Sequence, residues 1–124
     1  VVVHQVPETD PSYVLASVFQ STGVVLAMPT YEYKMFPPMA AILDEIGKKK
    51  ITGRVGFRFG SYGWSGGAQK ELDEILERTK MKWDFIEPLE FKGRPTEADL
   101  KLIEQRGKEL GQRVQEMVGA LVSA

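Results

Sequence analysis

Four stretches of the chain carry the short apolar runs that are typical of buried β-strands. The clearest is the uninterrupted run between Gly23 and Pro29. The predicted strands are Val1–Val6, Val24–Met28, Arg54–Phe59 and Trp83–Phe91. Pro88 has no N–H to donate, so we expect the last of these strands at an edge of the sheet.

Amphipathic stretches with helical spacing alternate with these runs. Asp10 and Pro11 suit a helix start, and Thr96 and Asp99 are spaced as in a capping box. We predict four helices. The first begins at Asp10–Pro11, the second runs from about Phe36 to Ile46, the third from Ala68 to about Thr79, and the fourth from Pro95–Thr96 to about residue 122. This alternation predicts an α/β fold in three layers, with a doubly wound parallel sheet between helices.

The length of 124 residues fits a single domain. The last predicted helix would span roughly 39 Å at 1.5 Å per residue, which is more than one strand needs as cover. We therefore expect residues 112–124 to form a helical extension that packs on another chain or domain through its apolar side chains.

Composition excludes several classes of function. The formal net charge is −1, which provides no basic field for nucleic acid or for an anionic membrane. The sequence has no Cys, which excludes disulfides, thiolate metal sites and a cysteine nucleophile in this chain. Its apolar runs are far shorter than the roughly 20 residues that cross a bilayer, so we expect no membrane span in this sequence. His4 lies in a predicted strand without neighbouring ligands, and the acidic residues of the third predicted helix suit a solvated face, so we expect no metal site. A reducing, cytoplasmic location is our expectation.

Two loops that follow predicted strands carry the candidate chemistry. The first is Pro29–Pro38 and the second is Gly60–Gly67, and each places aromatic residues among small ones. In an open parallel sheet, ligands bind beyond the carboxyl ends of the strands. Glycines let backbone amides approach a ligand, and aromatic faces stack on a planar ring. The two loops together predict a site for a flat heteroaromatic cofactor.

Directly after a predicted strand, the chain reads Gly60-Ser61-Tyr62-Gly63-Trp64-Ser65-Gly66. This loop resembles the flavin loop of flavodiiron proteins, also called A-type flavoproteins. Pro29-Thr30, followed by Met35-Phe36-Pro37, resembles the other flavin loop of the same flavodoxin-like domain. The resemblance implies an FMN-binding electron-transfer domain that passes electrons to a diiron domain or another redox partner protein. It implies no catalytic side chain in this chain, which we do not expect to be a complete enzyme alone.

The resemblance also assigns the cofactor-binding residues. They are Pro29, Thr30, Tyr31, Glu32 and Tyr33 in the first loop, and Ser61, Tyr62, Gly63, Trp64, Ser65 and Gly66 in the second. Main-chain amides near Tyr62 to Trp64 would donate to the carbonyl oxygens of the ring.

Compared with a flavodoxin, the chain departs from the pattern at its start. A flavodoxin begins with a central strand and a Ser/Thr-rich loop for the FMN phosphate, and neither is recognisable in this sequence. We expect a strand to be missing between Val1–Val6 and Val24–Met28, and FMN to bind weakly without it. An upstream segment, a strand from a second copy in a homo-oligomer, or direct pairing of the two strands would fill the position.

Two other functions stay open. The first is an NAD(P)H-dependent FMN or quinone reductase of the same superfamily, which needs room for nicotinamide beside the flavin. Bulky Tyr62 and Trp64 disfavour this alternative. The second is a structural fragment that binds no cofactor.

Overall fold

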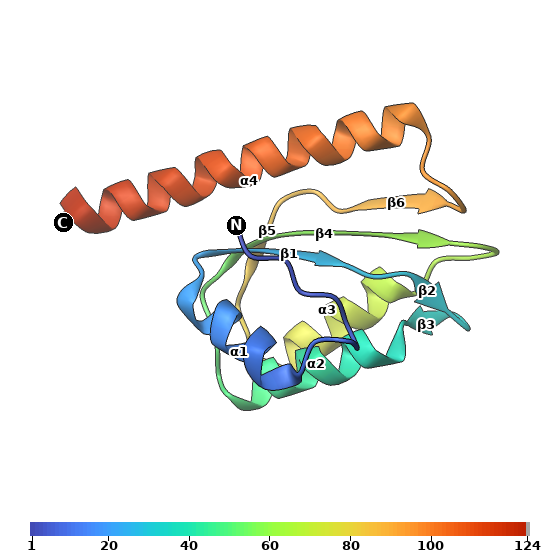
Figure 1. The fold of residues 1–124 in the computed structure, drawn as a ribbon, viewed down its shortest axis with the longest axis horizontal. Helices are drawn as coiled ribbons and strands as arrows, with labels where there is room; N and C mark the ends of the chain where they lie inside the picture. The colour runs from blue at the N-terminus through green and yellow to red at the C-terminus, as the bar shows by residue number, and fades with distance from the viewer. Residues whose placement is uncertain (124) are drawn as a thin grey trace.

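The computed structural model describes residues 1–123 and forms a parallel sheet with helices on both faces. In Figure 1, α4 (Glu97–Ser123) lies along one face, whereas α1 (Pro11–Gln20), α2 (Pro37–Lys48) and α3 (Ala68–Thr79) lie on the other. This arrangement is the three-layer α/β architecture that the alternation of strands and helices predicts.

The sheet is built around one long strand. β4 (Val55–Tyr62) pairs in parallel with β1 (Gly23–Ala27) on one side, and with β5 (Asp84–Phe85) and β6 (Leu89–Lys92) on the other. The register sets Val25 opposite Phe57 and Ser61 opposite Phe91. β4 continues through Tyr62, beyond its predicted end, because β6 supplies hydrogen-bond partners for the additional residues.

Two apolar cores fill the space between the layers. The larger core lies between the sheet and the three helices α1 to α3, with Leu43 and Leu72 fully buried. The smaller core lies under α4, where Leu110 packs with Val55 and Phe57. β4 alternates: Val55, Phe57 and Phe59 contribute to the core under α4, and Gly56, Arg58 and Gly60 lie between them along the strand.

The helix starts agree with the sequence signals. The Asp10 carboxylate accepts hydrogen bonds from both the hydroxyl and the N–H of Ser12. These bonds lower the pKa of Asp10, the one from the hydroxyl more than the one from the N–H. Thr96 and Asp99 form the expected reciprocal capping box, with Asp99 Oδ2 2.8 Å from Thr96 N and Thr96 Oγ1 3.2 Å from Asp99 N.

Two strand predictions are wrong. Val1–Val6 forms no strand, since it pairs with no other segment among residues 1–123, and Val1, Val2 and Val3 are exposed. This segment is held by side chains instead, through the 2.7 Å contact between His4 Nε2 and Ser17 Oγ. The predicted strand Trp83–Phe91 is two short strands, because residues 86–88, which include Pro88, interrupt the ladder.

A small hairpin was not predicted. β2 (Thr30–Tyr31) and β3 (Lys34–Met35) are antiparallel and are joined by a tight turn at Glu32 and Tyr33. Both turn residues adopt left-handed backbone angles, with φ of 47° and 64°. Such turns usually contain Asn or Gly, and this one lacks both, so the sequence carried no turn signal.

None of the helices among residues 1–123 is long and apolar enough to cross a membrane.

Candidate functional site

The two predicted loops meet at the carboxyl ends of β1 and β4, where the β2–β3 hairpin faces the loop that follows β4 (Figure 1). A cavity of about 270 Å³ lies between them. Its lining consists of Thr30, Glu32, Tyr33, Gly63, Trp64 and Ser65. The site is therefore assembled from two segments that are 30 residues apart in the chain and neighbours in space.

Two glycines allow the close contact between these segments. A Cβ on Gly60 would overlap the backbone carbonyl of Met28, at the end of β1. A Cβ on Gly67 would overlap the backbone carbonyl of Tyr33, in the hairpin turn. Any other residue would push the two loops apart, so these glycines set the width of the cavity.

Two hydrogen bonds tie the hairpin to the start of α3. Thr30 Oγ1 accepts from the N–H of Ala68 at 3.2 Å, and Glu71 Oε2 accepts from the N–H of Met35 at 2.6 Å. These bonds satisfy an amide at the helix start and one in the hairpin. They also fix the position of the turn that carries Glu32 and Tyr33.

The sequence had not identified this role of Glu71, which was expected on a solvated face. Glu71 is partly buried, and its carboxylate serves as an acceptor for the hairpin. Asp73 is also engaged, in an ion pair with Arg58. Within the described residues, no group of three or more His, Cys, Asp or Glu side chains is arranged to hold a metal ion.

The aromatic residues of the cavity are open to solvent. Trp64 is 94% exposed and Tyr33 is 69% exposed. An indole this exposed keeps nearly all of its hydration, so a planar ligand that covers it would gain the hydrophobic free energy of that contact.

The loop after β4 also offers backbone donors. Among the described residues, the N–H groups of residues 63–67 meet no acceptor within the chain. A run of free amides beside an exposed aromatic ring suits a flat ligand that carries acceptors on its edge.

Of the eleven residues predicted to bind a cofactor, the cavity brings together Thr30, Glu32, Tyr33, Gly63, Trp64 and Ser65. The structure places the others around it rather than in its lining. Pro29 precedes the hairpin and Tyr31 belongs to its strand β2. Ser61 and Tyr62 belong to β4, and Gly66 lies against the carboxylate of Glu90.

The site fits the ring of a flavin nucleotide better than its phosphate. At about 270 Å³ the cavity is slightly smaller than the roughly 300–1,000 Å³ typical of pockets for whole drug-sized ligands. Helix N-termini are the usual phosphate sites, and those of the described residues are poorly suited. At α3 the N–H of Ala68 already donates to Thr30, and the Glu71 carboxylate in the first turn would repel an anion. At α2 the first two positions are Pro37 and Pro38, which have no N–H.

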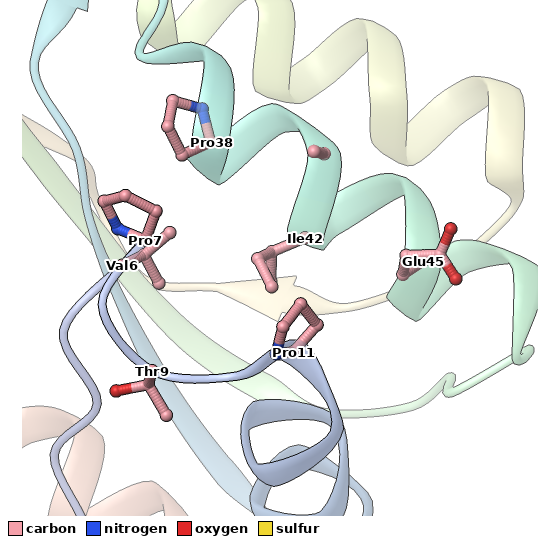
Figure 2. A pocket seen from close by; sticks show the side chains of 8 residues that line it. Val6, Pro7, Thr9, Pro11, Pro38, Ile42 and Glu45 are labelled. Carbon is pink, nitrogen blue, oxygen red and sulfur yellow. The ribbon is translucent and has the colours of Figure 1, made fainter.

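A second cavity, of about 200 Å³, lies between the segment before α1 and the start of α2 (Figure 2). Pro7, Pro11, Pro38 and Ile42 face it, and its only polar side chains are those of Thr9 and Glu45. It offers no set of groups that could bind a polar ligand or perform chemistry.

Comparison with known proteins shows which proteins the chain resembles. No family model matches it. The anaerobic nitric oxide reductase flavorubredoxin of Escherichia coli K12 is 30% identical over 111 residues, which are 90% of this chain and 23% of the flavorubredoxin. The chain thus spans about a quarter of the length of the curated relatives it matches.

Solved structures agree with this relationship. The flavodiiron protein of Giardia intestinalis matches with a TM-score of 0.81 and 29% identity, over 88% of this chain and 27% of that protein. A flavodoxin from the domain Archaea matches with a TM-score of 0.72 and 29% identity, over 82% of this chain and 71% of the flavodoxin. The chain is a flavodoxin-like domain related to the flavodiiron proteins and to the archaeal flavodoxin.

Proposed function

We propose that this domain binds FMN through the ring and serves as an electron-transfer module for a redox partner. The observation that carries the proposal is the cavity between the hairpin and the β4 loop, where exposed Trp64 lies beside the free amides of residues 63–67. The relationship to flavodiiron proteins and to a flavodoxin supports the identity of the ligand.

In this proposal the chain positions the ring and tunes its charge. Trp64 and Tyr33 supply the aromatic surfaces, and the amides of the loop donate to the acceptors on the edge of the ring. Bound FMN would supply the one- and two-electron chemistry, for which no side chain of the site need transfer a proton. The only carboxylate in the lining, Glu32, places a negative charge near the ring.

The redox partner is part of the proposal. A diiron domain of the kind that flavodiiron proteins carry, or a separate redox protein, would accept electrons over the exposed ring edge. The open aromatic face of the cavity is consistent with a partner that approaches from solvent.

The test is a comparison of flavins. We expect FMN and riboflavin to bind the chain with similar, weak affinity, because the described helix N-termini provide little for the phosphate. Titration with each flavin, followed by quenching of flavin fluorescence, measures both affinities. Absence of binding for both flavins at millimolar chain concentration would contradict the proposal.

A further inference from the structure

Two connections at the amino end of the sheet carry a group of lysines. Lys49 and Lys50 lie between α2 and β4, and Lys80 and Lys82 lie between α3 and β5. All four are exposed, and we call them the lysine patch. Because β4 and β5 are parallel, the residues that precede them lie at one end of the sheet. In Figure 1 this end is opposite the β2–β3 hairpin.

Hydrogen bonds between the two connections bring the lysines together. Gly53 N donates to Met81 O at 3.3 Å, and Trp83 Nε1 donates to Ile51 O at 2.9 Å. Each lysine of the patch lies within two residues of one of these bonded groups. The patch is therefore one surface, assembled from two segments about 30 residues apart in the chain.

Neighbouring carboxylates do not neutralise the patch. Segments 44–54 and 77–84 together contain seven cationic and four acidic residues, although the formal net charge of the chain is −1. Three of the four carboxylates already form ion pairs with other residues. The pairs are Asp44–Arg78, Glu45–Lys48 and Asp84–Arg113. Among the described residues, no carboxylate forms an ion pair with a lysine of the patch.

Helix dipoles offset only part of this charge. α2 and α3 both end at the patch, and the C-terminus of a helix carries about −0.5 elementary charge. With Glu77, the fourth carboxylate, the negative charge amounts to about two units. About half of the positive charge of the four lysines is therefore left without a counterpart in the chain.

The backbone of the patch provides an independent observation. Within residues 1–123, five residues other than glycine have left-handed backbone angles. Glu32 and Tyr33 belong to the hairpin turn of the candidate site, and the other three are Lys50, Lys80 and Lys82, with φ of 57°, 55° and 54°. Glycine is the usual residue in this conformation, because a Cβ makes it unfavourable. Lysine at all three positions lowers the stability of the fold, and such residues cluster at functional sites.

The surroundings of the patch favour one class of anionic partner. No large hydrophobic residue of segments 44–54 and 77–84 is exposed. The patch thus offers no aromatic ring on which a nucleic acid base could stack, and no apolar side chain that could enter a membrane. The remaining residues of the chain carry a net negative charge, which repels a polyanion longer than the patch.

We propose that the lysine patch binds an acidic protein through a compact cluster of carboxylates on the surface of that partner. Contacts between exposed lysines and carboxylates are individually weak and sensitive to salt, so the complex would be transient. The patch lies at the opposite end of the sheet from the candidate flavin site. A partner bound there leaves the aromatic cavity accessible, so this interaction is additional to the proposed electron transfer.

The experiment uses a labelled oligoglutamate peptide of about eight residues as the acidic probe. Fluorescence anisotropy measures its affinity for the chain, and amide chemical shifts locate the contact. We expect shift changes in residues 48–54 and 78–84 only. The affinity should fall at least about tenfold between about 20 and 200 mM salt, because exposed charges are screened.

A triple variant separates binding from stability. With Lys50→Gly, Lys80→Gly and Lys82→Gly, the chain should bind the peptide at least about tenfold more weakly, since most of the patch is removed. Its urea midpoint should be no lower than that of the wild type, because glycine adopts left-handed backbone angles freely.

A second triple variant is the matched control. Lys70→Gln, Lys92→Gln and Lys101→Gln remove three exposed lysines outside the patch and give the same net charge. At about 100 mM salt the Debye length is about 10 Å, so distant charges contribute little. Peptide affinity in this control should stay within about twofold of the wild-type value.

Four results would overturn the proposal. The first is unchanged peptide affinity in the glycine variant, and the second is an equal loss of affinity in the control, which would reflect net charge alone. The third is a lower urea midpoint of the glycine variant, which would assign the lysines to folding. The fourth is tighter binding of a short DNA duplex or of phosphatidylserine vesicles through the same lysines. None of these readouts involves a flavin, so they are independent of the proposed function.

Discussion

The backbone carbonyl of Tyr33 lies directly against Gly67, with no room for a Cβ between the hairpin turn and the start of α3. This contact joins the two halves of the cavity, and it exists only because residue 67 has no side chain. The geometry of the site thus depends on a residue that does not line it.

Gly67→Ala should destabilise the domain by about 1–3 kcal/mol, because the added methyl must displace the hairpin. Gly63→Ala is the matched control, since a Cβ there meets nothing within 4 Å. Urea unfolding measures both. Equal stability of the wild-type chain and Gly67→Ala would show that the hairpin moves freely and that the cavity width is not fixed.

Gln69 is the one buried polar residue of the described core, 8% exposed, and neither its amide oxygen nor its amide nitrogen meets a partner. Because an unpaired buried amide costs roughly 1–3 kcal/mol, Gln69→Met should raise the free energy of unfolding by about 1 kcal/mol. Lys70→Met, at the exposed neighbouring position, should leave it within about 0.5 kcal/mol of the wild-type value. A less stable Gln69→Met variant would mean that the amide is in fact paired.

Glu32 is expected to tune the bound flavin. Its carboxylate lines the cavity and disfavours additional negative charge on the ring, so Glu32→Gln should raise the midpoint potential of bound FMN. Glu74→Gln, on the exposed face of α3, is the control and should leave the potential unchanged. Spectroelectrochemical titration compares them, and equal potentials in the two variants would remove Glu32 from the site.

The fold class could be predicted from the sequence, since apolar runs such as Val24–Met28 alternate with capped amphipathic helices. The errors lie where structure depends on distant partners. Val1–Val6 has the composition of a strand, yet a strand forms only beside a neighbour, and the described residues provide none. β4 extends to Tyr62 because β6 pairs with it, which no local pattern of residues 60–62 reveals.

The candidate site was predictable to a similar extent. Aromatic and glycine residues after two parallel strands indicated which loops would meet, because the carboxyl ends of such strands lie at one end of the sheet. The contacts that hold the loops together were not predictable. The bond from Met35 to Glu71 and the contact of Tyr33 with Gly67 depend on a hairpin whose turn residues, Glu32 and Tyr33, give no turn signal.

The most direct test of the account is the flavin affinity of Trp64→Ala, compared with that of Tyr13→Ala. Both replace an exposed aromatic residue, but only Trp64 lines the cavity, whereas Tyr13 lies on α1. Flavin fluorescence titration should show riboflavin and FMN binding weakened about tenfold in Trp64→Ala, which corresponds to about 1.4 kcal/mol, with Tyr13→Ala unchanged and both variants as stable as the wild type. Equal flavin affinity in Trp64→Ala and the wild-type chain would contradict the assignment of this cavity as the flavin site.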